Sequence, residues 1–62
     1  MKLIEALKPV FEEDKKIRKT GWPLVNFVGM RDGVLSIFLI DGEFHKWVIS
    51  AEDILATDWM IL

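Results

Sequence analysis

Apolar residues recur at helical spacing in the first part of the chain, and charged residues fall opposite them. The apolar face consists of Leu3, Leu7, Val10 and Phe11. This pattern predicts an amphipathic helix. Pro9 lies within it and cannot donate a backbone hydrogen bond, which costs roughly 3 kcal/mol inside a helix. We therefore expect the helix either to begin again at Pro9 or to kink there.

From Lys15 onward the pattern changes to the alternating and continuous apolar runs that are typical of strands. A short basic strand starts at Lys15, and further strands are predicted at Val25–Met30, Val34–Ile40 and Glu43–Ile49. Asp-Gly pairs separate the last three strands, and such pairs supply the positive φ that tight hairpin turns require. The run Val34–Ile40 is apolar on both faces except at Ser36. It is expected to be a central strand with the helix on one face and a second protomer on the other.

The last part of the chain carries a helix start signal followed by a final apolar run. Ser50 and Asp53 have the spacing of a capping box, which marks a short helix of about two turns. Asp58–Leu62 then reads as a strand. The predicted order is α-β-β-β-β-α-β, an α+β fold around a small antiparallel sheet. We expect residues 1–62 to form a single domain.

Composition narrows the possible classes of protein. A chain of 62 residues is too short for a multidomain enzyme, and 52% hydrophobic residues are more than one small protomer easily hides. The surplus favours oligomerisation or a permanent partner. The net charge of −2 argues against nucleic acid as the partner. No apolar run is long enough for a membrane helix and no signal peptide is recognised, so we expect a soluble, intracellular protein of the cytoplasm with no membrane partner.

Catalytic and metal-binding groups are scarce. The chain has one His, no Cys and no Tyr. His45 with Ser36 or Ser50 would be a conceivable triad, but nothing nearby resembles a nucleophile elbow. Asp32 and Asp41 precede Gly, where turn chemistry explains them better than calcium binding does. We therefore predict no enzyme activity, no catalytic residue, no metal site and no cofactor.

A basic stretch and three tryptophans are the main candidates for ligand binding. Four of the eight basic residues, Lys15, Lys16, Arg18 and Lys19, come just before Trp22. They either attract an anionic nucleotide beside an aromatic platform or keep an edge strand solvated. Trp59 is predicted to lie in the core, and Trp22 and Trp47 on exposed or interface surfaces. The alternative is that all three rings fill the core.

Three segments together resemble the second Thoeris anti-defence family of small phage and prophage proteins. The segments are Glu5–Leu7, Lys16–Trp22 and Trp47–Trp59. The most specific feature is the spacing Trp-x-x-Ser-x-x-Asp-(Ile/Leu)-Leu-Ala-x-Asp-Trp. The resemblance implies a sponge that binds a cyclic nucleotide immune signal, of the cyclic ADP-ribose type or a cyclic dinucleotide, and sequesters it intact. It also implies an α+β homo-oligomer with ligand pockets where protomers meet.

Site residues follow from these motifs. The resemblance implies that Trp22 and Trp47 stack on the ligand, and that Ser50 and Asp53 lie near the pocket and cap the last helix. It also implies that Asp58–Trp59 has a structural role in completing the fold. From the residue types we add two ligand-binding candidates, Arg18 for phosphate and Asn26 for a base or ribose.

Two departures from the family leave other functions open. Ile49–Ala51 stands where members usually have Pro-Ser-Gln, and tight hairpins replace longer middle loops. Because loops carry specificity, a compact relative can keep the scaffold and change its target. The alternative function is a protein-binding inhibitor of a host or bacterial defence enzyme. Binding of single-stranded nucleic acid through Lys16, Arg18 and Trp22 ranks last because of the negative net charge.

Overall fold

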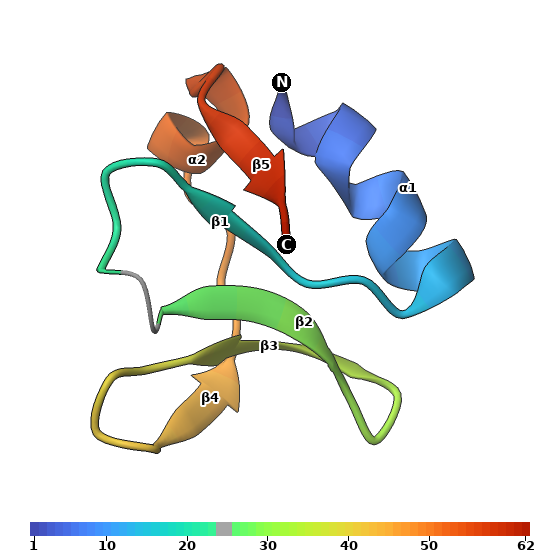
Figure 1. The fold of residues 1–62 in the computed structure, drawn as a ribbon, viewed down its shortest axis with the longest axis vertical. Helices are drawn as coiled ribbons and strands as arrows, with labels where there is room; N and C mark the ends of the chain where they lie inside the picture. Colours follow the sequence, from blue (N-terminus) through green and yellow to red (C-terminus); the bar gives the residue numbers. More distant parts are fainter. Residues whose placement is uncertain (24–25) are drawn as a thin grey trace.

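A five-stranded antiparallel sheet with two helices makes up the part of the chain that the structure, a computed structural model, describes: residues 1–23 and 26–62 (Figure 1). The elements are α1 (Leu3–Glu13), β1 (Ile17–Lys19), β2 (Phe27–Arg31), β3 (Val34–Phe38), β4 (Phe44–Lys46), α2 (Ala51–Leu55) and β5 (Trp59–Ile61). This order confirms the predicted α+β fold. Val25, the predicted start of the second strand, lies outside the described residues.

The strands lie in the order β4-β3-β2-β1-β5, so the last strand is placed beside the first. In the antiparallel β1–β5 pair, Ile17 faces Ile61 and Lys19 faces Trp59. The amide of Leu62 donates to the carbonyl of Lys16 at 2.8 Å. These bonds hold the carboxyl end of the chain in the sheet, which chain ends need if they are not to fray.

Helix α1 runs as one element from Leu3 to Glu13 with Pro9 inside it. The expectation that the helix begins again at Pro9 is therefore wrong. Leu3, Ala6 and Val10 are buried, and packing of this stripe offsets the hydrogen bond that Pro9 cannot make. The exposed side chain of Phe11 does not belong to the buried face. Asp14 ends the helix in the left-handed region, at φ 56°.

The core lies between α1 and one face of the sheet. Its buried apolar residues are Leu3, Ala6, Val10, Ile17, Val28, Trp47 and Trp59. Helix α1 packs on β1, β2, β5 and α2, and within the described residues it does not reach β3. The strand β3 is an inner strand, as expected, but the prediction that the helix covers it is wrong. The helix lies toward β5 instead. Hydrogen bonds join Met1 to Thr57, just before that strand, and to Trp59 within it.

Both hairpins turn at the predicted Asp-Gly pairs. Asp32 and Gly33 have φ values of 52° and 79°, as a two-residue type I′ turn requires. At the second turn Gly42 has φ 86°, and the Asp41 carboxylate accepts the Glu43 amide at 2.9 Å. The strands on either side are shorter than predicted, since β3 ends at Phe38 and β4 ends at Lys46. Neither helix is long and apolar enough to span a membrane, as far as the described residues go.

Candidate functional site

Trp59 lies at the centre of a cluster of three tryptophans. Its ring centroid is 5.2 Å from that of Trp22 and 5.6 Å from that of Trp47, and both pairs meet edge to face. Trp59 is buried, which confirms its predicted place in the core. Trp47 is only 8% exposed, so the expectation that it lies on the surface of the protomer is wrong. Trp22 is half-buried and is the most accessible ring of the cluster.

The burial of Trp47 has a local cause. It follows directly after β4, and its amide donates to the Leu35 carbonyl of the neighbouring strand at 3.0 Å. The β-strand period then directs its ring to the face that α1 covers, the face to which Trp59 also points. Its predicted role in stacking on a ligand remains a prediction.

An ion pair joins the tryptophan cluster to α2. Lys19 Nζ lies 2.7 Å from Asp53 Oδ1, with both side chains 14% exposed. The same ammonium group lies 5.8 Å from the Trp22 ring centroid and 5.5 Å from that of Trp59. Trp59 Nε1 donates to the Asp53 carbonyl at 2.9 Å. The side chain of Asp53 thus contacts β1, and its backbone carbonyl contacts β5.

Asp53 also completes the predicted capping box. Its carboxylate accepts the Ser50 amide at 3.1 Å, and the Ser50 hydroxyl accepts the Asp53 amide at 3.2 Å. Burial acts to raise the pKa of this carboxyl, but hydrogen bonds from Lys19 and Ser50 and the positive charge of Lys19 outweigh it. The pKa therefore lies below its ordinary value, and Asp53 is anionic at neutral pH.

Arg18, the predicted phosphate partner, is buried and bonded within the protomer. Its Nη1 atom donates to the Trp22 carbonyl at 2.8 Å and to the Lys19 carbonyl at 3.1 Å. The guanidinium group therefore fixes the turn that carries Trp22. Phosphate binding by Arg18 remains a prediction, and a ligand would have to compete with these two carbonyls.

Asn26 contributes a buried acceptor at the edge of the cluster. Its amide donates to the Pro23 carbonyl at 2.9 Å. The antiparallel register that pairs Ile17 with Val28 also places Asn26 opposite Lys19. Within residues 1–23 and 26–62, the buried Oδ1 atom of Asn26 has no hydrogen-bond partner. An unpaired buried acceptor is uncommon in folded proteins and suits a ligand donor.

The structure thus brings five of the predicted site residues into one chain of contacts: Arg18, Trp22, Trp47, Ser50 and Asp53. Sequence analysis placed Lys19 in the basic stretch but did not predict its ion pair with Asp53, because the two residues lie far apart along the chain. The alternation of β1 was the available signal, since it places Lys19 on the same face as the core residue Ile17.

Within the described residues, Ser36 and His45 are not arranged as a nucleophile and its base. Ser36 pairs with Lys46 whereas His45 pairs with Ile37, so Ser36 and His45 point to opposite faces of the sheet. The Ser36 hydroxyl donates to the Val34 carbonyl at 3.1 Å. His45 Nε2 lies 3.4 Å from a Glu43 carboxylate oxygen. The described residues contain no group of His and acidic side chains able to hold a metal ion.

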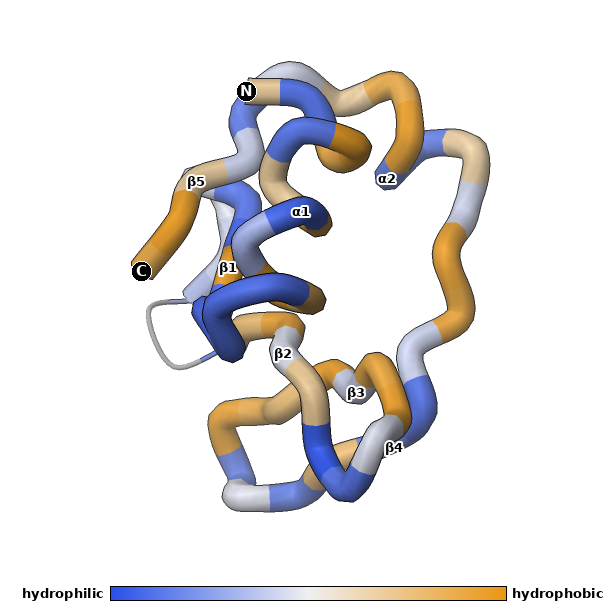
Figure 2. Tube along the Cα trace, turned by 90° about the vertical axis from the view of Figure 1, so that its right-hand side faces the viewer, coloured by the Kyte–Doolittle hydropathy of each residue, from blue (hydrophilic) through white to orange (hydrophobic). Residues whose placement is uncertain are grey.

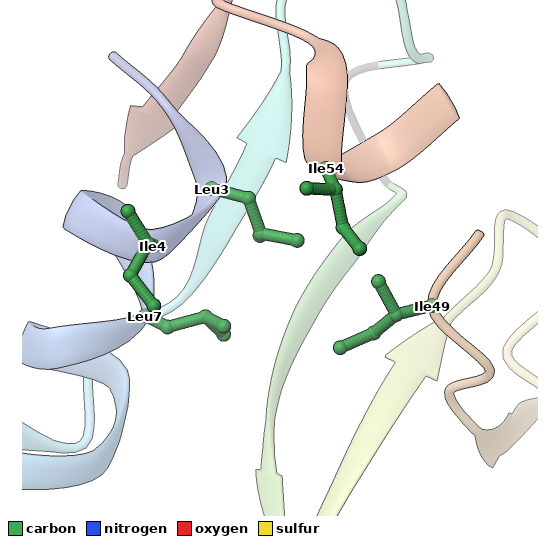
Figure 3. Close-up of a pocket in the computed structure, with 5 residues that line it drawn as sticks. All are labelled: Leu3, Ile4, Leu7, Ile49 and Ile54. Atoms are coloured by element: carbon green, nitrogen blue, oxygen red, sulfur yellow. The ribbon is translucent and has the colours of Figure 1, made fainter. Parts of the chain in front are cut away.

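An aliphatic groove of about 240 Å³ opens beside the core (Figure 3). It lies between α1, α2 and the connection from β4 to α2, and its lining residues are Leu3, Ile4, Leu7, Ile49 and Ile54. Figure 2 shows that the middle of this connection is hydrophobic and that the connection passes apart from α1. The groove offers no charged or polar side chain, so it suits an apolar partner rather than an anion.

Comparison with known proteins gives one match. The family model described as Tad2-like, Thoeris anti-defense 2-like domain, matches residues 1–62. The match includes the two terminal motifs and the basic strand between them. A search of curated proteins and a search of solved structures found no match to the chain.

Proposed function

Because the chain belongs to the Thoeris anti-defense 2-like domain family, we propose that it binds a cyclic nucleotide immune signal and withholds it, intact, from its receptor. The family match over residues 1–62 carries this proposal and gives the chain its anti-defence role. That the chain sequesters a signal is what its resemblance to members of this family implies.

The side chains of the described residues support binding rather than cleavage. The hydroxyl of Ser36 and the imidazole of His45 lie on opposite faces of the sheet, so neither activates the other. The half-buried Trp22 ring, with the Lys19 ammonium beside it, is suited to stacking on a base. The buried Asn26 Oδ1 atom, which has no hydrogen-bond partner among the described residues, is suited to a base or ribose donor.

We place the ligand where Trp22, Trp47, Arg18, Asn26, Ser50 and Asp53 meet a second protomer. A single protomer buries Arg18 and Trp47, leaves Trp22, Asn26 and Asp53 half-buried, and exposes Ser50. A neighbouring copy would supply the second wall of the pocket. The homo-oligomer is therefore part of the proposal, and the exposed apolar residues beside α1 and α2 support it.

Native mass spectrometry tests the proposal directly. The purified protein is measured alone, with cyclic ADP-ribose and with cyclic di-GMP, and the bound ligand is weighed again after denaturation. We expect a homo-oligomer that takes up a fixed number of ligands and releases them with unchanged mass. No uptake of either probe at micromolar concentration would overturn the proposal, and a ligand of altered mass would show cleavage.

The groove of Figure 3 favours a second candidate, inhibition of a host or bacterial defence enzyme by direct binding. Its aliphatic lining suits a hydrophobic side chain of a protein partner better than it suits a nucleotide. Immobilised protein would then retain one stoichiometric partner from a bacterial lysate, and Ile54→Glu would abolish that retention. Retention that Ile54→Glu leaves unchanged would exclude the groove as the docking site.

A further inference from the structure

Two neighbouring cations of β1, Arg18 and Lys19, differ in what they can still bind. Strand alternation directs them to opposite faces of the sheet, and Lys19 pairs with Trp59, so its side chain lies on the side of the tryptophan cluster. Arg18 is 7% exposed, and its Nη1 atom already donates to the Lys19 and Trp22 carbonyls. Arg18 therefore holds the turn that carries Trp22 and has little left to offer an added anion.

Lys19 has hydrogen-bonding capacity that the protomer does not use. An ammonium group carries three N–H donors. Among the described residues, the only acceptor placed against this group is Asp53 Oδ1, at 2.7 Å from Nζ. The Lys19 side chain is 14% exposed, so solvent still reaches part of it. Two N–H donors of Lys19 are therefore left for a ligand.

Two indole rings surround the ammonium group. Lys19 Nζ lies 5.8 Å from the Trp22 ring centroid and 5.5 Å from that of Trp59. An aromatic face attracts a cation, but an anionic oxygen makes a stronger hydrogen bond with it. Trp22 is the more accessible of the two rings. A base stacked on Trp22 and a phosphate oxygen on Lys19 can therefore belong to one nucleotide.

Asp53 holds the Lys19 ammonium in this position. Its Oδ1 atom pairs with Lys19, and its Oδ2 atom accepts the Ser50 amide at 3.1 Å. Both oxygens are thus engaged by donors, which offsets the negative charge that an approaching phosphate meets. The Asp53 carbonyl accepts Trp59 Nε1 at 2.9 Å, so the backbone is fixed as well. Asp53 is therefore a positioning residue for Lys19.

We propose that Lys19, held by Asp53, binds a phosphate group of the cyclic nucleotide at the tryptophan cluster. This inference rests on the proposed function and names the phosphate contact within that same site. A phosphate oxygen accepts the unused N–H donors of Lys19 in charge-assisted hydrogen bonds, which are roughly twice as strong as neutral ones. Arg18 acts through the turn that it fixes, by presenting the Trp22 ring to the base.

Titration calorimetry with cyclic ADP-ribose and cyclic di-GMP tests the assignment on matched variants. Lys19→Met removes the charge but keeps an unbranched apolar stem beside the indole rings, and should weaken binding by about ten-fold or more. The double variant Lys19→Met with Asp53→Asn also removes the carboxylate that Lys19→Met leaves unpaired, and should bind as weakly. Lys8→Met is the control, because Lys8 is exposed on α1 and the same charge is lost. It should bind like the wild type.

The dependence of affinity on salt separates a phosphate contact from a structural effect of the substitution. Added sodium chloride screens the attraction between a cation and a phosphate. The wild type and Lys8→Met should therefore lose affinity as the ionic strength rises, and both Lys19 variants should lose less. Circular dichroism and thermal melting verify that each variant is folded.

The outcomes distinguish the phosphate contact from the function. If the wild type binds neither probe, the proposed function fails. If the wild type binds and both Lys19 variants bind equally well, Lys19 is not the phosphate contact. If the double variant recovers wild-type affinity, the unpaired Asp53 carboxylate caused the loss and the assignment is overturned. Weak binding by both variants with the salt dependence of the wild type would overturn it too, because the effect would then be structural.

Discussion

Trp47 and Trp22 both contact Trp59, but solvent reaches the two rings to different extents. Trp47 is buried, so Trp47→Ala is expected to lower the free energy of unfolding by about 3–5 kcal/mol. Trp22 is half-buried, and the Arg18 bond to its backbone carbonyl survives truncation of the ring. Trp22→Ala should therefore remain cooperatively folded and lose ligand binding. Urea unfolding followed by circular dichroism measures the difference in stability.

Phe11→Ala provides the control for this pair, because its ring is large and 58% exposed on α1. It should change the free energy of unfolding by less than about 1 kcal/mol. A Trp47→Ala variant as stable as Phe11→Ala would show that the Trp47 ring does not belong to the core. A Trp22→Ala variant that unfolds would remove the argument that this ring is available to a ligand.

The Asp53 carboxylate makes stability depend on pH. Its pKa in the folded protein lies below the unfolded value of about 3.9, so its contribution is present above that value and is lost as the pH falls through the folded pKa. Asp53→Asn should be less stable than wild type by about 1–3 kcal/mol at pH 7, where it leaves Lys19 without its partner. The difference in the free energy of unfolding between wild type and Asp53→Asn should become smaller at acidic pH.

Urea unfolding of wild type and Asp53→Asn between neutral pH and pH 3 measures this effect. Glu12→Gln is the control, since Glu12 is exposed on α1. It should differ little from wild type at any pH. A difference between wild type and Asp53→Asn that stays constant across the acid range would contradict the role given to the carboxylate charge.

At the scale of elements, the β2–β3 hairpin depends on a positive φ at Gly33. Gly33 has φ 79°, which an L side chain adopts at a cost of about 1–2 kcal/mol. Gly33→Ala should therefore lower the melting temperature by roughly 4–8 °C for each kcal/mol lost. Gly21→Ala is the control, because an added Cβ meets nothing within 4 Å in the described residues and φ is not positive there. Equal melting temperatures for both variants would refute the turn assignment.

Local signals predicted the elements well because each depends on a few neighbouring residues. The two Asp-Gly turns and the Ser50–Asp53 capping box lie where the sequence indicates them. The prediction that the helix begins again at Pro9 was wrong because the penalty of one lost hydrogen bond was weighed without the packing of α1 on the sheet. The position of α1 away from β3 depends on bonds between Met1 and the end of the chain, and no local pattern contains that information.

For the candidate site, too, local patterns could not predict contacts between distant parts of the chain. The pairing of Lys19 with Asp53 requires the β1–β5 register, which is non-local. The contact between the stacked rings of Phe27 and Phe38 could have been predicted, however. A two-residue turn at Asp32-Gly33 pairs Arg31 with Val34, and counting back from that pair places Phe27 opposite Phe38. Turn chemistry and the period of two are thus sufficient to find an aromatic row across two strands of a hairpin.

At the scale of the whole molecule, the exposed aliphatic side chains are the main unexplained feature of a single protomer. Ile4 is 77% exposed on α1, and Ile49 and Ile54, which line the groove with it, are also exposed. Burying such residues against a second copy is favourable by roughly 25 cal/mol for each Å² of apolar surface. We expect this surface to hold the proposed homo-oligomer together.

Ile4→Glu should convert the oligomer to monomer, because the substitution would bury a charge without a partner in the contact between copies. Ile40→Glu is the matched control, since Ile40 is 72% exposed but lies in the β3–β4 turn, away from the groove-lining residues. It should leave the sedimentation equilibrium mass unchanged. If ligand pockets form between protomers, monomeric Ile4→Glu also loses ligand binding while its thermal unfolding remains cooperative. An Ile4→Glu variant that stays oligomeric would place the contact elsewhere, and a monomer that still binds ligand with wild-type affinity would show that each protomer holds a complete site.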